Sequence, residues 1–142
     1  WSSDVCSSDL VLQALEENKK GSLNSIDGVF SPWQTTEMIG SAIPSNLKNR
    51  WNFHFGSSTE NLNNVLSSVI YVDIFLHDSL HTYKNMMFEF EMAWPYISSG
   101  GFLISDDIGD NNAFYDFCTK LNLDFITLKQ KSGMYLGIIK KY

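Results

Sequence analysis

VIYVDIFLHD occupies residues 69–78 and GGFLISDD occupies residues 100–107, and these two stretches decide the fold. Each is an almost continuous apolar run that ends in acid, at Asp78 in the first and at Asp106 and Asp107 in the second. Such a run is typical of a strand that is covered on both faces in a parallel sheet. Residues 82–97 between them carry apolar side chains at helical spacing. The order strand, helix, strand predicts two central strands that are neighbours in the sheet.

The flanking sequence continues the alternation of helix and strand. Trp51–Phe55 alternates apolar and polar residues, which predicts an edge strand with one wet face. Asn111 or Asn112 is suited to cap a helix. The other expected elements are helices over Val11–Lys20, Thr35–Ile43 and Thr59–Leu66, a strand over Leu23–Asp27, and a terminal hairpin of Phe125–Leu128 with Met134–Ile139. This pattern predicts an α/β protein, with a three-layer, Rossmann-like, mostly parallel sheet and a C-terminal antiparallel hairpin.

Composition excludes several classes of function. The 142 residues suffice for one domain, and the net charge of −6 with Arg50 as the single arginine argues against nucleic-acid binding. No apolar run approaches the roughly 20 residues of a membrane helix, so we expect no membrane segment. Cys6 and Cys118 form neither a disulfide framework nor a zinc pattern, which favours a reducing, cytoplasmic location.

The first ten residues, WSSDVCSSDL, differ in character from the rest. They lack a helical or strand period and resemble a translated sequencing-adapter sequence. We therefore expect residues 1–10 to be a non-native leader and residues 11–142 to be the functional domain. The alternative is a natural serine-rich leader.

Acidic and polar residues follow the predicted parallel strands, and the densest group is Asp78, His81, Asp106 and Asp107. Neighbouring strands lie about 5 Å apart, so three carboxylates would converge. Carboxylates this close repel one another unless a cation intervenes, and oxygen ligands favour a hard ion such as Mg²⁺, Mn²⁺ or Ca²⁺. The alternative is that one or two of them are solvated or cap helices.

Two further residues have chemistry that suits a site. His81 lies three positions after Asp78 and is a candidate general base beside the metal, whereas His77 is expected to fill the end of its strand. Asp27 ends a strand that follows a helix, which suits an acid that binds the hydroxyls of a ribose.

The chain resembles class I S-adenosylmethionine (SAM)-dependent methyltransferases, and in particular the family of macrocin-type, metal-dependent sugar O-methyltransferases. The resemblance runs from about Val11 to the end. It is carried by SLNSID, FHFGSSTENL, VDIFLHDSLHTY and AWPYISSGGFLISDDI, of which D-x-x-H-x-Y followed by G-G-x-L-I-x-D-D is the most specific. The resemblance implies transfer of a methyl group from SAM to a hydroxyl of a small molecule, such as a sugar.

The same resemblance implies roles for individual residues. Asp78, Asp106 and Asp107 would bind Mg²⁺, and His81 would be the general base. Asp78 is also expected beside the cofactor. The remaining cofactor contacts implied by the resemblance are Asp27 at the ribose and Gly56, Ser57 and Ser58 at the adenine.

The chain departs from the family pattern at its beginning. The first strand and the glycine-rich turn that hold the methionine part of SAM are not found, and six strands are predicted where the family has seven. We therefore expect an incomplete methyltransferase domain. The alternatives are a non-catalytic α/β binding module and, less consistent with the order of the motifs, a phosphoacceptor receiver domain. Association into a homo-oligomer is left open.

Overall fold

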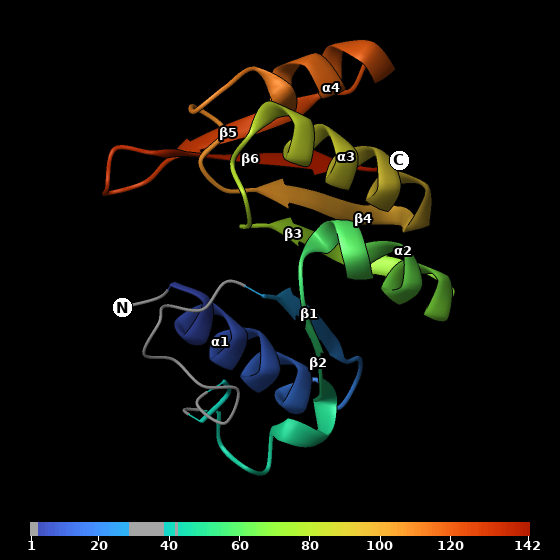
Figure 1. The fold of residues 1–142 in the computed structure, drawn as a ribbon, viewed down its shortest axis with the longest axis vertical. Coiled ribbons are helices and arrows are strands. Elements are labelled where there is room, and N and C mark those ends of the chain that lie inside the picture. The colour runs from blue at the N-terminus through green and yellow to red at the C-terminus, as the bar shows by residue number, and fades with distance from the viewer. Residues whose placement is uncertain (1–2, 29–38, 42) are drawn as a thin grey trace. The chain divides into compact units, whose positions relative to one another are not determined.

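A computed structural model describes residues 3–28, 39–41 and 43–142, and the chain divides into two compact units (Figure 1). The first unit comprises residues 1–61 and the second residues 62–142. The boundary falls inside helix α2, Ser58–Ser68. The helix expected over residues 35–43 falls largely outside the described residues, so it stays a prediction.

The first unit pairs a helix with two parallel strands. Its elements are α1 (Ser3–Glu17), β1 (Leu23–Asp27), a 3-10 turn η2 (Lys48–Arg50) and β2 (Trp51–Phe55). Strands β1 and β2 are in parallel register from Leu23 opposite Trp51 to Asp27 opposite Phe55. A small core forms around Leu12, which is fully buried with Ile43 and Leu47. Because β1 and β2 are parallel and in register, their carboxyl ends lie side by side.

Helix α1 begins at Ser3, earlier than the predicted start at Val11. Serine and aspartate are weak helix formers, so the sequence of residues 3–10 gave no helical signal. A helix that is anchored by buried Leu12 extends beyond its apolar face because each added residue gains a backbone hydrogen bond. The proposal that residues 1–10 are a non-native leader stays a prediction.

The end of α1 is tied by an ion pair to η2, the turn that leads into β2. Glu16 accepts a hydrogen bond from Arg50 Nε at 2.8 Å and forms an ion pair with Lys19. Arg50 also donates to the backbone oxygen of Gly21 at 3.1 Å. The hydrogen bonds from Lys19 and then from Arg50 lower the pKa of Glu16 to about 2. The single arginine of the chain thus has a structural role.

The second unit is a four-stranded mixed sheet with the strand order β3-β4-β6-β5. Strands β3 and β4 are parallel, and β6 is antiparallel to both β4 and β5. The elements are β3 (Val72–His77), α3 (Tyr83–Ala93), a 3-10 turn η3 (Trp94–Tyr96), β4 (Ile97–Ser105), α4 (Ala113–Leu121), β5 (Phe125–Lys129) and β6 (Tyr135–Lys140). The α/β class, the adjacency of the two apolar strands and the terminal hairpin are confirmed.

One face of this sheet packs against α3 and α4 (Figure 1). The predicted stripe of α3 supplies Met86 and Phe90, both fully buried, whereas Tyr83 is half exposed and Ile97 begins β4 instead of ending the helix. Full burial of a phenylalanine contributes about 1.5–3 kcal/mol. The core of this unit consists of Met86, Phe90, Ile97, Leu103, Ile108, Ala113, Phe114, Phe117, Cys118 and Ile139.

The prediction that both apolar strands are central and covered on both faces is wrong for β3. Among the described strands, β3 is an edge strand of its sheet. Ile74 is 60% exposed and Leu76 47% exposed, whereas Phe75 packs on the core. Alternate side chains of a strand point to opposite faces, and α3 and α4 cover only one of them. A short apolar run does not distinguish these two situations.

Candidate functional site

The predicted site residues of the second unit follow the carboxyl ends of β3 and β4. His77 ends β3 opposite Ser105, which ends β4. One residue further on, Asp106 N donates to the backbone oxygen of His77 at 2.9 Å. The loop of residues 78–82 and the loop of residues 106–112 therefore leave the sheet side by side, as predicted from the sequence.

The two loops are joined by Asn111. Its side-chain amide donates to the backbone oxygen of His81 at 3.2 Å, and its side-chain oxygen accepts from Ala113 N at 2.8 Å. Of the two asparagines that could cap α4, Asn111 thus makes the side-chain bond, while the side chain of Asn112 makes no capping bond. Asn111 thus both caps the first turn of α4 and holds the loop that carries His81.

Asp107 lies at a sharp turn of the second loop. Its φ is +46°, in the left-handed region that aspartate tolerates better than most residues. Burial raises the pKa of Asp107, the nearby charge of Asp106 raises it further, and His81 opposes the shift. Asp107 is therefore electrostatically coupled to both Asp106 and His81, which come from different loops.

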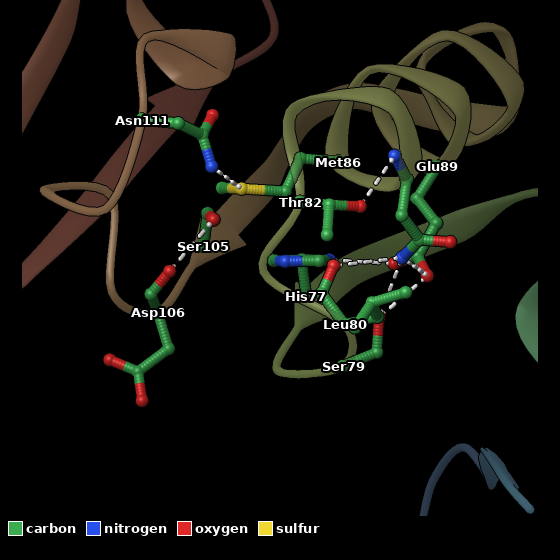
Figure 2. A network of polar contacts seen from close by, with 10 residues as sticks. His77, Ser79, Leu80, Thr82, Met86, Glu89, Ser105, Asp106 and Asn111 are labelled. Atoms are coloured by element: carbon green, nitrogen blue, oxygen red, sulfur yellow. Dashed lines mark hydrogen bonds and ion pairs between the residues drawn. The ribbon is translucent and has the colours of Figure 1, made fainter.

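Asp106 has a partner that the sequence did not indicate. Its carboxylate accepts a hydrogen bond from the side-chain amide of Gln130, which follows β5. Figure 2 shows its carboxyl group pointing away from His77 and Glu89. Asp78 directly follows β3 and is half buried.

In the part of the chain that the structure describes, no group of three or more His, Cys, Asp or Glu residues is arranged to hold a metal ion. Asp78, Asp106 and Asp107 come to the same edge of the sheet, but they do not form a ready-made metal centre. The engagement of Asp106 by Gln130 is one physical reason. Their role as metal ligands stays a prediction.

A polar network lies beneath the first loop, against α3 (Figure 2). His77 is fully buried, and its Nδ1 lies 2.7 Å from Glu89 Oε2. The other carboxylate oxygen of Glu89 accepts hydrogen bonds from Ser79 Oγ and from the side-chain amide of Asn85. The position of His77 agrees with the expectation that it fills the strand end. Glu89 and Asn85 were missed, because both occupy a helix whose sequence is otherwise typical of a packed apolar face.

His81 packs beside this network. Its ring meets that of His77 edge to face, with centroids 5.1 Å apart. The Nε2 atoms of both histidines are buried and have no hydrogen-bond partner among the described residues. The role of His81 as a general base stays a prediction.

The predicted cofactor residues of the first unit gather at the ends of β1 and β2. Gly56 N donates to the backbone oxygen of Asp27 at 3.1 Å. A Cβ on Gly28 would lie only 2.6 Å from the backbone of Gly56, and Gly56 has a φ of +124°. Glycine is required at both positions, and their contact fixes the ends of the two strands beside the half-buried Asp27.

Ser57 precedes α2 and Ser58 is its first residue, and the structure shows that Ser57 is bound to an acid, Glu60, in the first turn of the helix. Glu60 accepts hydrogen bonds from Ser57 N at 2.8 Å and from Ser57 Oγ at 2.7 Å. These bonds lower the pKa of Glu60, the side-chain bond most strongly. The spacing S-x-x-E is that of a capping box, so the sequence did contain the signal that identifies Glu60.

Residues 6–108 match a family model described as a methyltransferase domain. No curated protein matches the chain. Among the helices that the structure describes, none is both long and apolar enough to cross a membrane.

Solved structures with the same fold include O-methyltransferases. An O-methyltransferase from Bacillus cereus in complex with SAH has a TM-score of 0.66 at 14% identity, over 85% of this chain and 63% of that one. The O-methyltransferase NovP has a TM-score of 0.67 at 13% identity, over 94% and 66%. The MycE methyltransferase in complex with Mg and SAH has a TM-score of 0.56 at 12% identity, over 85% and 37%. This chain thus spans less than two thirds of the length of these three proteins.

Proposed function

This chain belongs to the family of methyltransferase domains, and from this premise we propose that its protein transfers a methyl group from SAM to a hydroxyl group of a small molecule. One observation carries the proposal. The loops after β3 and β4 converge and bring His81 near Asp107, and Nε2 of His81 is buried without a hydrogen-bond partner among the residues that the structure describes. Solved structures of this fold that contain SAH, the product left after SAM gives up its methyl group, support the choice of cofactor.

The first unit fits the adenosine part of the cofactor. Asp27 would accept hydrogen bonds from the ribose hydroxyls, and Gly56, Ser57 and Ser58 would pass along the adenine. The close approach of Gly28 and Gly56 supports this proposal, because it holds Asp27 and residues 56–58 beside each other, where one ligand can contact both. When bound, SAM supplies an electrophilic methyl group on a sulfonium centre.

The second unit fits the proton transfer. His81 would take the proton of the acceptor hydroxyl at Nε2, and the resulting alkoxide oxygen would attack the methyl carbon in line with the bond that breaks. Because Nε2 is covered in this structure, the side chains around it must rearrange when the acceptor binds. The side chain of Leu80 in the loop of residues 78–82 is 64% exposed and does not contribute to the buried core, while its backbone oxygen is held by Asn85.

Dependence on Mg²⁺ is a separate proposal. Asp78, Asp106 and Asp107 are its candidate ligands, and their position at one edge of the sheet supports it. The described residues do not assemble a metal centre, so no step above passes through a metal. A sugar hydroxyl is the acceptor we propose to test first, because the motifs of residues 72–83 and 93–108 resemble those of sugar O-methyltransferases.

Calorimetric titration of the full-length protein with SAM and SAH, each with and without Mg²⁺, tests the cofactor. Asp27→Asn removes a charged acceptor and should weaken SAM binding about 10- to 100-fold, since a hydrogen bond to a charged group contributes about 1.5–3 kcal/mol. Asp124→Asn, at an exposed turn in the second unit, is the matched control and should leave binding unchanged.

Methylation of a panel of sugars and other hydroxylated small molecules, followed with isotopically labelled SAM, tests the reaction. His81→Gln should abolish transfer and keep SAM binding. Full activity of that variant would contradict the role of His81. Absence of any binding of SAM or SAH would contradict the whole proposal and favour a non-catalytic α/β binding module.

A further inference from the structure

Glu89 is a buried acid on the helix face that packs against the sheet. It is 3% exposed, in a helix that also buries Met86, Phe90 and Ala93. A carboxylate in such surroundings is costly unless donors surround it. Glu89 has three of them, because His77 Nδ1 lies at 2.7 Å, Ser79 Oγ at 2.7 Å and Asn85 Nδ2 at 2.9 Å. Apolar packing alone would be served better by leucine, so the acid calls for another explanation.

The network fixes the loop that carries the proposed base. Asn85 Nδ2 also lies 3.1 Å from Ser79 Oγ and 3.1 Å from the backbone oxygen of Leu80. Glu89 and Asn85 therefore hold two consecutive loop residues to the first turns of α3 (Figure 2). Those two residues lie directly between Asp78 and His81. Asn111 holds His81 from the other side by binding its backbone oxygen.

The same carboxylate orients His77. A nitrogen 2.7 Å from a carboxylate oxygen carries a proton, so Nδ1 of His77 donates to Glu89 and the ring is held in one orientation. The ring is held between two others, that of Phe90 at 5.4 Å and that of His81 at 5.1 Å, both nearly edge to face. The ring of His77 is thus held in place and contacts the ring of His81 directly.

We propose that Glu89 is a positioning residue for methyl transfer: it fixes His77 and the loop of residues 78–82, and through them it sets the orientation of His81. Glu89 and His77 do not touch the reacting atoms. The role in catalysis rests on the proposed function, whereas the ordering of the loop does not. The two neighbouring histidines thus have different roles: His77 helps to orient the ring of His81, and His81 takes the proton of the acceptor hydroxyl.

Glu89→Gln is the decisive variant, because the side chain keeps its size but turns an NH₂ group toward at least one of the present donors. Misplacement of a reacting group by about 1 Å costs on the order of 100-fold in rate. We expect kcat to fall about 10- to 100-fold, with a much smaller change in the KM for SAM, because Asp27 and residues 56–58 of the first unit are untouched and only Asp78 lies in the loosened loop. Glu91→Gln is the matched control on the same helix. Glu91 is 46% exposed in an ion pair with Lys120, and its variant should keep full activity.

Ser79→Ala is the second variant, and it decides the question if Glu89→Gln does not fold. Ser79 is exposed, so its loss cannot open the core, yet it removes one donor to Glu89. We expect a smaller loss of kcat with the same KM. An unchanged kcat in Ser79→Ala together with an unchanged kcat in any folded Glu89→Gln protein overturns the proposal.

NMR of the imidazole groups gives a measurement that needs no turnover. In the unmodified protein the Nδ1 proton of His77 should be protected from solvent exchange, and the rings of His77 and His81 should show mutual NOEs. Glu89→Gln should abolish both signals, whereas Glu91→Gln should keep them. If the signals behave in this way but no methylation is found, the network stands and the proposed function fails. Retained signals in Glu89→Gln would refute the positioning role directly.

Discussion

Gly137→Ala tests how closely α4 packs against the sheet beside the site. Gly137 lies in β6 opposite Ser105, the last residue of β4 before Asp106. A Cβ at this position would lie 2.5, 2.6 and 2.8 Å from three ring carbons of Phe114. Carbon atoms ordinarily approach to about 3.5 Å, so the added methyl group would overlap the ring by roughly 1 Å.

The ring of Phe114 has little room to retreat. It is fully buried, and its neighbours are the rings of Phe125 at 5.5 Å, Tyr115 at 5.8 Å and Phe90 at 6.3 Å. Over-packing a filled core costs about 1–3 kcal/mol. Because several rings would have to shift together, we expect Gly137→Ala to reduce the free energy of unfolding by the upper part of this range.

Urea denaturation measures this change, and Gly109→Ala is the control. A Cβ at Gly109 would meet no atom within 4 Å, and the residue is exposed. The double variant with Phe114→Leu adds a second check, because a smaller side chain relieves the overlap and the two effects should not add. Equal stability of Gly137→Ala and Gly109→Ala, or strict additivity in the double variant, would refute the reasoning.

Two further predictions concern titratable groups. Glu60→Gln should destabilise the start of α2 at neutral pH. The pKa of Glu60 in the folded protein lies below its ordinary value of 4.5. The stabilisation that the Glu60 carboxylate gives to the folded state is therefore present above pH 4.5 and is lost as the pH falls through the folded-state pKa. Urea titrations should therefore show a gap between the unmodified protein and Glu60→Gln at pH 7 that closes in acid, and an equal gap at both pH values would contradict the capping role. Burial raises the pKa of the Cys118 thiol to about 11, so in a Cys6→Ser background a thiol reagent at pH 8 should react slowly with the folded protein and rapidly in denaturant. Rapid reaction without denaturant would show that the core around Cys118 opens.

Local patterns predicted the elements because each of them depends on neighbours in the sequence. The apolar runs before Asp78 and Asp106 predicted adjacent parallel strands, and β3 and β4 pair in this way. The turn around residues 131–133 predicted the terminal hairpin of β5 and β6. The start of α1 was misplaced because its first residues are weak helix formers, and they are helical only as an extension of the turn anchored by Leu12.

The sequence alone determined which residues stand at the ends of the strands, because the period of the side chains and the position of each turn are local properties. His81, Asp106 and Asp107 were identified in this way. Only the tertiary structure decided which partners these residues have: Glu89 beneath the loop of His81, and Gln130 on Asp106. Such contacts join residues that lie far apart in the chain, and their geometry depends on how helices and hairpins pack on the sheet. No periodicity encodes that packing, so the residues at the strand ends could be predicted while the network that supports them could not.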